Sequence, residues 1–298
     1  MTPAPRTAAA RSPFRGILLV LAAMALFPVL DGIAKYLTDD YHVVQLSWAR
    51  SFFQTLTVLA IIAVFVRRPA RVARTRRPGL QVARGLIMVT SNLLYFLALT
   101  FMPLADTVAI LFVGPLLVTA LSVPILGETV GPRRWIAVAI GLVGALVIIR
   151  PGLGVFQWAA LLPLAVAFLF ACYQIITRSL AATESPLTTL LYTSVVSLIP
   201  VLVATPFVWT PPTPTAWGLF AIVGILAGVA HFALIKAYDF ANASTLAPYV
   251  YFQIVSGAGM GYLMFGDFPD RWTILGAAVI VTSGVYVAYR ESRAKPTN

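Results

Sequence analysis

Long uncharged apolar runs, separated by short polar or proline-containing segments, make up most of this chain. A helix that spans a membrane needs about 20 mostly apolar residues, and several of these runs reach that length. The run 185–235 is too long for one span, and the prolines from Pro206 to Pro214 divide it into two helices. The pattern predicts ten transmembrane helices, at about 14–37, 44–66, 79–101, 104–126, 133–150, 157–179, 186–206, 215–236, 244–265 and 271–289.

The composition excludes several classes of protein. Hydrophobic residues make up 60% of the chain and charged residues 10%, whereas soluble domains carry about 25% charged residues. The expected fold class is therefore an all-α integral membrane protein. Cys172 is the only cysteine, so the chain can form no internal disulfide, and no Cys/His spacing predicts a metal site. The apolar stretch after Arg15 is too long for a signal peptide, and we interpret it as a retained first helix.

The basic residues predict the orientation in the membrane. If the N-terminus is inside, the outer half holds only Lys35, Arg50, Arg150 and Arg271, and the other 17 of the 21 Lys and Arg residues, with Arg84 among them, lie on the inner side. This bias predicts cytoplasmic termini, with tails at 1–13 and 291–298, in a bacterial-type inner membrane. It also explains the net charge of +11 without a nucleic-acid partner. We interpret the basic segment 67–77 as a topology anchor, with contact to anionic membrane lipids as the alternative.

Two parts of the chain repeat one another. Gly127 is followed by Glu128, and Gly266 is followed by Asp267; a second glycine comes 17 residues later in the first copy and 18 residues later in the second. We therefore expect two five-helix repeats, at 14–150 and 151–290. Five is an odd number, so the second repeat must sit upside down relative to the first. Many secondary transporters share this plan and place their substrate site between the repeats.

At this point the chain resembles the drug/metabolite transporter superfamily, and within it the EamA family. The similarity lies in the Gly-Glu and Gly-Asp marks, in Gly32 and Lys35 late in the first helix, and in Arg50 within the segment WARSFF. The segment APYVYFQIVSGAGMGYLMFGD is most similar to YddG-type exporters of aromatic and other neutral amino acids. This resemblance implies a ten-helix fold and facilitative export of a metabolite from the cytoplasm.

The insertion of a charged side chain at membrane depth costs about 2.5–3.5 kcal/mol of free energy, so each such residue calls for a structural or functional explanation. Asp31 and Lys35 are four residues apart and share one helix face. Arg50 enters the membrane from the same side. We expect these three to form one network in the outer half. The network is either a structural ion-pair cluster or an outer gate or binding site for a carboxylate. Asp106 is interpreted as a helix N-cap.

Neutral polar and aromatic residues predict the substrate site nearer the midplane. Such groups suit an amino-acid zwitterion with an aromatic side chain, although hydrogen bonds between helices are the simpler explanation for any one of them. Proline kinks at Pro115 and Pro248 mark the fourth and ninth helices as moving elements. The substrate-binding candidates are Asn92, Tyr95, Tyr173, Gln174, His231, Tyr249 and Gln253.

The function that fits best is export of neutral or aromatic amino acids by alternating access, without a cofactor. The alternative is proton-coupled export of another small metabolite or a drug, and His231 is a candidate for that coupling. An integral-membrane enzyme is disfavoured because no set of acids and histidines can be assembled into a catalytic site, so we expect no enzymatic activity. Ten helices enclose a pathway in one monomer, and a dimer is left open.

Overall fold

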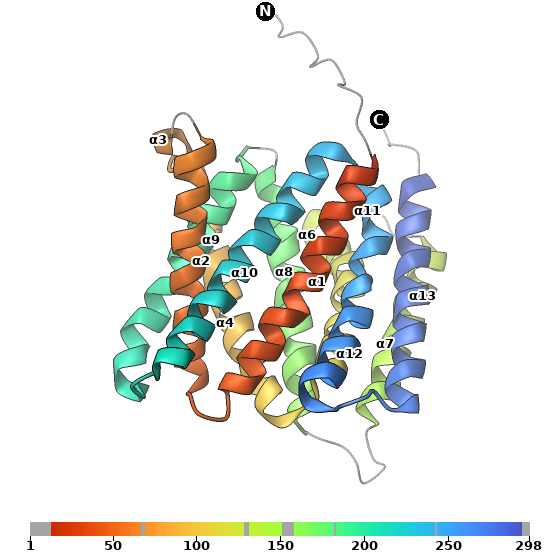
Figure 1. The fold of residues 1–298 in the computed structure, drawn as a ribbon. Helices are drawn as coiled ribbons and strands as arrows, with labels where there is room; N and C mark the ends of the chain where they lie inside the picture. The colour runs from red at the N-terminus through yellow and green to blue at the C-terminus, as the bar shows by residue number, and fades with distance from the viewer. Residues whose placement is uncertain are drawn as a thin grey trace, which may run out of the picture.

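The computed structural model of the protein is an all-helical bundle in the part of the chain that it describes, residues 13–66, 69–127, 131–150, 158–181, 183–241 and 243–293 (Figure 1). The tails, the residues Arg67 and Arg68, the acid Glu128 and the segment between the repeats, 151–157, lie outside these ranges. The helices are α1 (Pro13–Leu37), α2 (Val43–Phe65), α3 (Pro69–Val72), α4 (Pro78–Phe101), α5 (Leu104–Leu111), α6 (Gly114–Leu126), α7 (Pro132–Ile149), η1 (Trp158–Ala160), α8 (Leu161–Ala181), α9 (Pro186–Ala204), η2 (Thr205–Val208), α10 (Pro214–Phe240), α11 (Ala243–Val250), α12 (Phe252–Phe265) and α13 (Arg271–Arg293).

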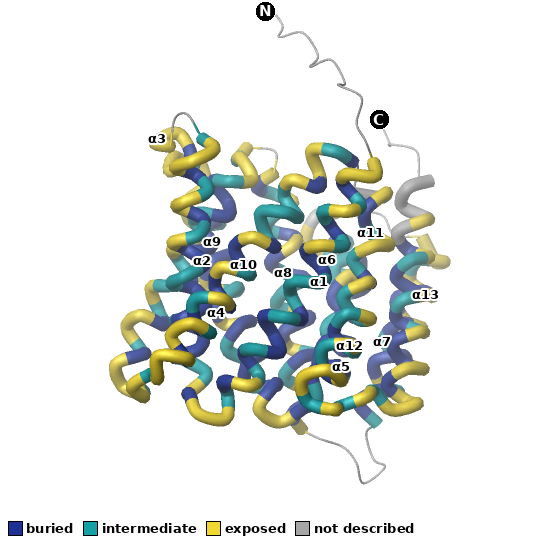
Figure 2. The backbone as a smooth tube through the Cα atoms, viewed as in Figure 1, coloured by how far each residue is buried: buried dark blue, intermediate teal, exposed yellow. Residues whose placement is uncertain are grey.

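The expected class, a helical protein that crosses a membrane several times, is confirmed. In the described part of the chain, eight helical segments are long and apolar enough to span a membrane. The last two predicted spans are not among these eight: α11 and α12 are separated at Tyr251, and the apolar part of α13 is the shorter stretch Arg271–Val287. The count of ten stays a prediction. Figure 2 shows the buried residues concentrated inside the bundle and the exposed ones outside, where large apolar side chains such as Phe65 and Leu263 are suited to contact lipid.

The two halves pack against each other in an exchanged pattern. The first helix of each half contacts the third long helix of the other half, so α1 lies along α10 and α8 lies along α4. The pairs α2 with α9 and α7 with α13 bring equivalent helices together. The interior of the bundle is therefore built from both halves, and a side chain that points inward from one half meets the other.

The contacts at one end of the bundle show that the halves run in opposite directions. Lys35, near the end of α1, donates a hydrogen bond to the carbonyl oxygen of Met102 over 2.9 Å. Trp158, at the start of the second half, packs on Phe101 with ring centroids 5.0 Å apart. The first helix of one half therefore ends where the other half begins. We call this end of the bundle the opposite face. The start of α1 and the end of α13 lie at the other end, which we call the termini face (Figure 1).

Both halves contain an interrupted helix. The first break lies between α5 and α6 at Phe112 and Val113, just before Pro115, and the second lies at Tyr251, three residues after Pro248. Proline has no N–H to donate to the carbonyl four residues earlier, which weakens the helix at both places. The two breaks touch, because the rings of Phe112 and Tyr251 have centroids 5.3 Å apart. The glycines that follow these helices, Gly127 and Gly266, both adopt the left-handed conformation that ends a helix.

At the opposite face, Asp270 fixes the start of α13. Its Oδ1 accepts hydrogen bonds from the backbone N–H of Trp272 (3.0 Å) and of Thr273 (2.8 Å), as an N-cap residue does. Its Oδ2 pairs with the guanidinium of Arg150, the last residue of the first half. Desolvation raises the pKa of Asp270, but the Thr273 and Arg150 hydrogen bonds outweigh this effect and hold the pKa below its usual range.

A pH-dependent contribution to stability follows from the lowered pKa of Asp270. The contribution is present above the pKa of the unfolded state and is lost as the pH falls through the lower folded value. Asp270→Asn keeps a good N-cap and removes the charge, so we expect a loss of about 0.5–1 kcal/mol at pH 7, small because the pair is solvent-screened. Thermal unfolding in detergent checks this. The difference in unfolding midpoint from wild type should shrink toward about pH 3, whereas a difference that is independent of pH would contradict the assignment. Asp239→Asn, at an exposed pair with Lys236, is the control.

Candidate functional site

The interior of the bundle is polar along three helices. Buried polar side chains recur at helical spacing on α2, α4 and α9, so each of these helices presents a polar face to the others. Most buried polar groups in proteins are paired, and hydroxyls of α9 such as Thr193 and Ser194 bond the carbonyl oxygen one turn earlier. The residues are Gln45, Ser47, Arg50, Ser51, Gln54 and Thr55 on α2; Gln81, Arg84, Ser91 and Asn92 on α4; and Thr188, Thr189, Thr193, Ser194 and Ser197 on α9.

Two opposite charges meet neutral partners on α4. Asp31 of α1 accepts a hydrogen bond from the Tyr95 hydroxyl at 3.0 Å. Arg50 of α2 donates from Nη1 to Oδ1 of Asn92 at 2.6 Å, and its guanidinium lies 5.8 Å from the ring centroid of Phe96. Asp31 and Arg50 also interact electrostatically. Asn92 and Tyr95 are three residues apart, so one face of α4 holds both charges.

A second guanidinium is buried closer to the termini face. Arg84 of α4 is only 6% exposed. Its Nε donates to Thr177 over 2.7 Å and its Nη1 to the carbonyl of Thr189 over 2.9 Å. Further hydrogen bonds reach Thr193 and the Tyr173 hydroxyl, and the guanidinium carbon lies 4.0 Å from the Tyr173 ring centroid. Arg84 therefore joins α4 of the first half to α8 and α9 of the second.

The burial of Arg84 is a feature that the charge pattern did not predict. By charge alone this residue was grouped with the basic residues of the inner side. Six residues after the start of α4, it lies about 9 Å into the helix. The hydroxyl spacing on α9, with Thr189 and Thr193 four residues apart, is the sequence signal that points to a polar face opposite it.

The predicted substrate-binding residues do not form one cluster. Asn92, Tyr95 and Tyr173 are buried in the polar interior just described. The Nδ1 atom of His231 lies 2.7 Å from the carbonyl oxygen of Ala227, and its ring packs edge-on against Phe27 with centroids 5.1 Å apart. His231 thus has a structural environment between α1 and α10.

The other three predicted residues are more exposed. Gln174 is exposed. By helical spacing it shares a face of α8 with Phe170 and Thr177, whereas the exposed apolar side chains of Leu161 and Phe168 lie on a different face of that helix. Tyr249 is exposed and Gln253 half-buried, on either side of the helix break at Tyr251.

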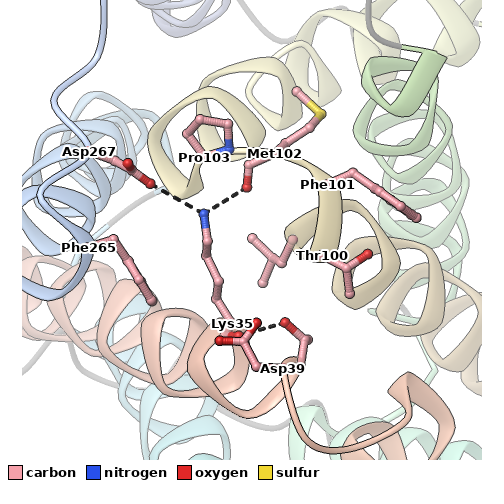
Figure 3. Close-up of a pocket in the computed structure, with 10 residues that line it drawn as sticks. Lys35, Asp39, Thr100, Phe101, Met102, Pro103, Phe265 and Asp267 are labelled. Carbon is pink, nitrogen blue, oxygen red and sulfur yellow. Dashed lines mark hydrogen bonds and ion pairs between the residues drawn. The ribbon is translucent and has the colours of Figure 1, made fainter.

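The structure divides the expected network of Asp31, Lys35 and Arg50. Lys35 turns to the opposite face, where its Nζ bonds the Met102 carbonyl and lies 3.5 Å from Oδ2 of Asp267 (Figure 3). The same ammonium lies 4.9 Å from the ring centroid of Phe265. Asp31 and Arg50 remain together in the interior.

A pocket of about 310 Å³ opens beside Lys35 at the opposite face. Its lining comes from both halves and includes Thr38, Asp39, Thr100, Met102 and Asp267. Lys35 and Asp267 both line this pocket, and their contact links α1 to the loop after α12.

The expected N-cap role of Asp106 is also corrected. The N-cap position of α5 is Pro103, and Asp106 lies inside the first turn. Its Oδ1 accepts a hydrogen bond from the hydroxyl of Thr273 at 2.8 Å. Asp106 therefore joins α5 to α13, a contact between the halves that only the tertiary structure reveals.

We expect the contact between Lys35 and Asp267 to keep the opposite face closed. Lys35→Glu replaces attraction by repulsion, and because a partly exposed pair is worth up to about 1 kcal/mol, the open population should rise about fivefold. A cysteine at Ala34, which is buried beside Lys35, should then react faster with an impermeant maleimide in a Cys172→Ser background.

Restoring the pair tests whether charge is the cause. The double variant Lys35→Glu with Asp267→Lys should return the labelling rate to the starting value. Equal rates in the parent and in Lys35→Glu would exclude a gating role for this contact.

Comparison with known proteins gives full-length matches. The model of the EamA-like transporter family matches residues 14–150 and again 157–289. The S-adenosylmethionine uptake transporter of Rickettsia prowazekii is 27% identical over 96% of each chain. The riboflavin transporter of Rhizobium johnstonii is 30% identical over 97% of this chain and 96% of its own. The pseudopaline exporter of Pseudomonas aeruginosa is 29% identical over 90% and 94%.

Proposed function

Because the chain belongs to the EamA-like transporter family, and so is a transporter of small metabolites rather than an enzyme, we propose that it exports neutral or aromatic amino acids by alternating access. The observation that carries this proposal is the buried polar interior around Asp31, Arg50, Asn92 and Tyr95. A carboxylate, a guanidinium, an amide and a phenol converge there beside the apolar ring of Phe96. A small number of convergent polar groups next to aromatic side chains is typical of binding sites for small polar metabolites.

The names of the relatives are compatible with this substrate class but do not select it. S-adenosylmethionine contains an amino-acid group, whereas riboflavin contains none. The relative named for pseudopaline is called an exporter. The proposed direction, out of the cytoplasm, rests on the resemblance to YddG-type exporters. The proposed placement is the inner membrane, with the termini face in the cytoplasm, because the basic residues gather on that side.

Proton-coupled transport of another metabolite or a drug is the second candidate. Asp31 favours it, since a carboxylate that is 4% exposed inside a membrane bundle is a possible carrier of a proton. His231 supports it less, because its ring is held by Ala227 and Phe27.

Flux in proteoliposomes tests the proposal. Radiolabelled phenylalanine, tryptophan, tyrosine, methionine and threonine are compared with labelled riboflavin and S-adenosylmethionine, with and without a pH gradient. Saturable amino-acid flux that ignores the gradient is the expected result. Flux that follows the gradient would favour the second candidate, and riboflavin flux without amino-acid flux would overturn the amino-acid proposal.

Two variants test the proposed substrate-binding role of Tyr249 and Gln253, which lie on either side of the helix break at Tyr251. Gln253→Ala and Tyr249→Ala should each lower amino-acid flux about tenfold if these side chains bind substrate, since a lost hydrogen bond in a desolvated site costs about 1–3 kcal/mol. Leu263→Ala, on the exposed side of α12, is the control for the helix. Wild-type flux in the first two variants would remove them from the site.

A further inference from the structure

We infer that Asp31 and Arg50 bind the two charged groups of a free amino acid: the Asp31 carboxylate takes the ammonium group and the Arg50 guanidinium takes the carboxylate. This inference rests on the proposed function and specifies how the substrate would be recognised. It also defines the class of ligand as an α-amino acid with both groups unmodified.

The first argument is that these two charges are buried but not paired with each other. Asp31 is 4% exposed and Arg50 is 7% exposed. Opposite charges inside a low-dielectric bundle attract strongly, and a buried pair is expected to close into an ion pair. In the described part of the chain each has a neutral partner on α4 instead, Tyr95 for Asp31 and Asn92 for Arg50.

The second argument is the unused hydrogen-bonding capacity. The Nε of Arg50 is fully buried and has no hydrogen-bond partner among the residues that the structure describes. Such an orphan donor is costly and calls for an explanation, such as a missing ligand. A carboxylate is the acceptor that matches a guanidinium, because it can accept two parallel N–H bonds. Within the described ranges Asp31 accepts one side-chain hydrogen bond, from Tyr95, and an ionised carboxylate has several acceptor positions left.

The third argument is spacing and charge balance. Asn92 and Tyr95 are three residues apart on one helix, about 4.5 Å along the axis, so they hold Arg50 and Asp31 close together but separate. The ammonium and carboxylate of an amino acid sit on one carbon atom and fit such a separation. A zwitterion has no net charge, and so it matches a site whose two charges cancel. An inorganic anion would use Arg50 alone, and a simple cation would use Asp31 alone.

The surroundings also suit the rest of the ligand. Phe96 lies beneath the Arg50 guanidinium, and its ring centroid is 6.3 Å from that of Tyr95. These two buried rings place apolar groups beside the charged groups, as contact with an aromatic side chain requires. Arg84 has no comparable role, since each of its three nitrogen atoms already bonds to the protein.

Two analogues of phenylalanine separate the two contacts. Phenylalaninamide keeps the ammonium and lacks the carboxylate charge, and 3-phenylpropionate keeps the carboxylate and lacks the ammonium. Each should compete with labelled phenylalanine at least about tenfold more weakly than phenylalanine itself in the wild-type protein. Asp31→Asn should abolish the discrimination against 3-phenylpropionate and keep that against phenylalaninamide. Arg50→Gln should do the reverse, and Lys236→Gln, at an exposed pair, should change neither.

The same experiment distinguishes the possible failures. If wild type carries phenylalanine but both variants discriminate as wild type does, the binding assignment is overturned and the proposed function stands. If wild type carries riboflavin and no amino acid, the proposed function itself fails. Where a variant has no flux, the rise of its unfolding midpoint on adding each compound in detergent gives the same comparison without turnover. The neutral double variant Asp31→Asn with Arg50→Gln avoids an uncompensated buried charge and should lose both discriminations.

Discussion

Arg84→Ala is expected to lower the thermal unfolding midpoint of the protein in detergent by about 10 °C. Arg84 holds three long helices from both halves together through Thr177, Thr189, Thr193 and Tyr173. Hydrogen bonds to a charged group contribute about 1.5–3 kcal/mol each, and loss of a buried network costs about 3–5 kcal/mol. Because 1 kcal/mol shifts the midpoint by about 2–4 °C in a large domain, the effect should be easy to measure.

Two further variants separate charge from geometry at Arg84. Arg84→Lys keeps the charge but loses the planar fork of donors, so we expect an intermediate loss of stability. The Arg77 side chain is exposed just before α4, so Arg77→Ala should have the same unfolding midpoint as the wild type. If Arg84→Ala also had the unfolding midpoint of the wild type, the contacts of Arg84 would make no net contribution to the stability of the protein.

Gly276→Ala is expected to destabilise the contact between α7 and α13 by about 1–3 kcal/mol, as overpacking does. A Cβ atom on Gly276 would lie 2.5 Å from the carbonyl oxygen of Gly144, and a Cβ on Gly144 would lie 2.9 Å from the carbonyl oxygen of Gly276. Both contacts are with backbone, which cannot rotate away as a side chain can. The helices would have to separate, so the unfolding midpoint in detergent should fall by several degrees.

A glycine with free space around it gives the matched control. Gly218 lies within α10, and a Cβ there would meet nothing within 4 Å. Gly218→Ala should therefore leave the midpoint unchanged or raise it, since alanine favours a helix by up to about 1 kcal/mol over glycine. Equal effects of the two substitutions would mean that helix propensity, and not close packing, decides the outcome.

The sequence by itself determined the ends of most long helices to within a few residues, although the predicted helices 104–126 and 244–265 are each interrupted in the structure. The first helix was expected at about 14–37 and runs from Pro13 to Leu37, and the third was expected at about 79–101 and runs from Pro78 to Phe101. These features are local: a run of apolar residues long enough to cross the membrane must satisfy its backbone hydrogen bonds as a helix, and proline and glycine set its ends. The repeat was visible for the same reason, because Gly127 and Gly266 end equivalent helices.

Only the tertiary structure decided which polar groups meet. The sequence grouped Lys35 with Asp31 by helix spacing, but Lys35 bonds Met102 and Asp267 from other helices. It placed Arg84 just inside the inner end of its helix by charge, but could not predict that α8 and α9 supply the partners that allow this residue to be buried. Hydropathy and charge counts treat each position alone, whereas the free energy of burying a charge depends on hydrogen-bond partners that lie up to 232 residues away in the sequence.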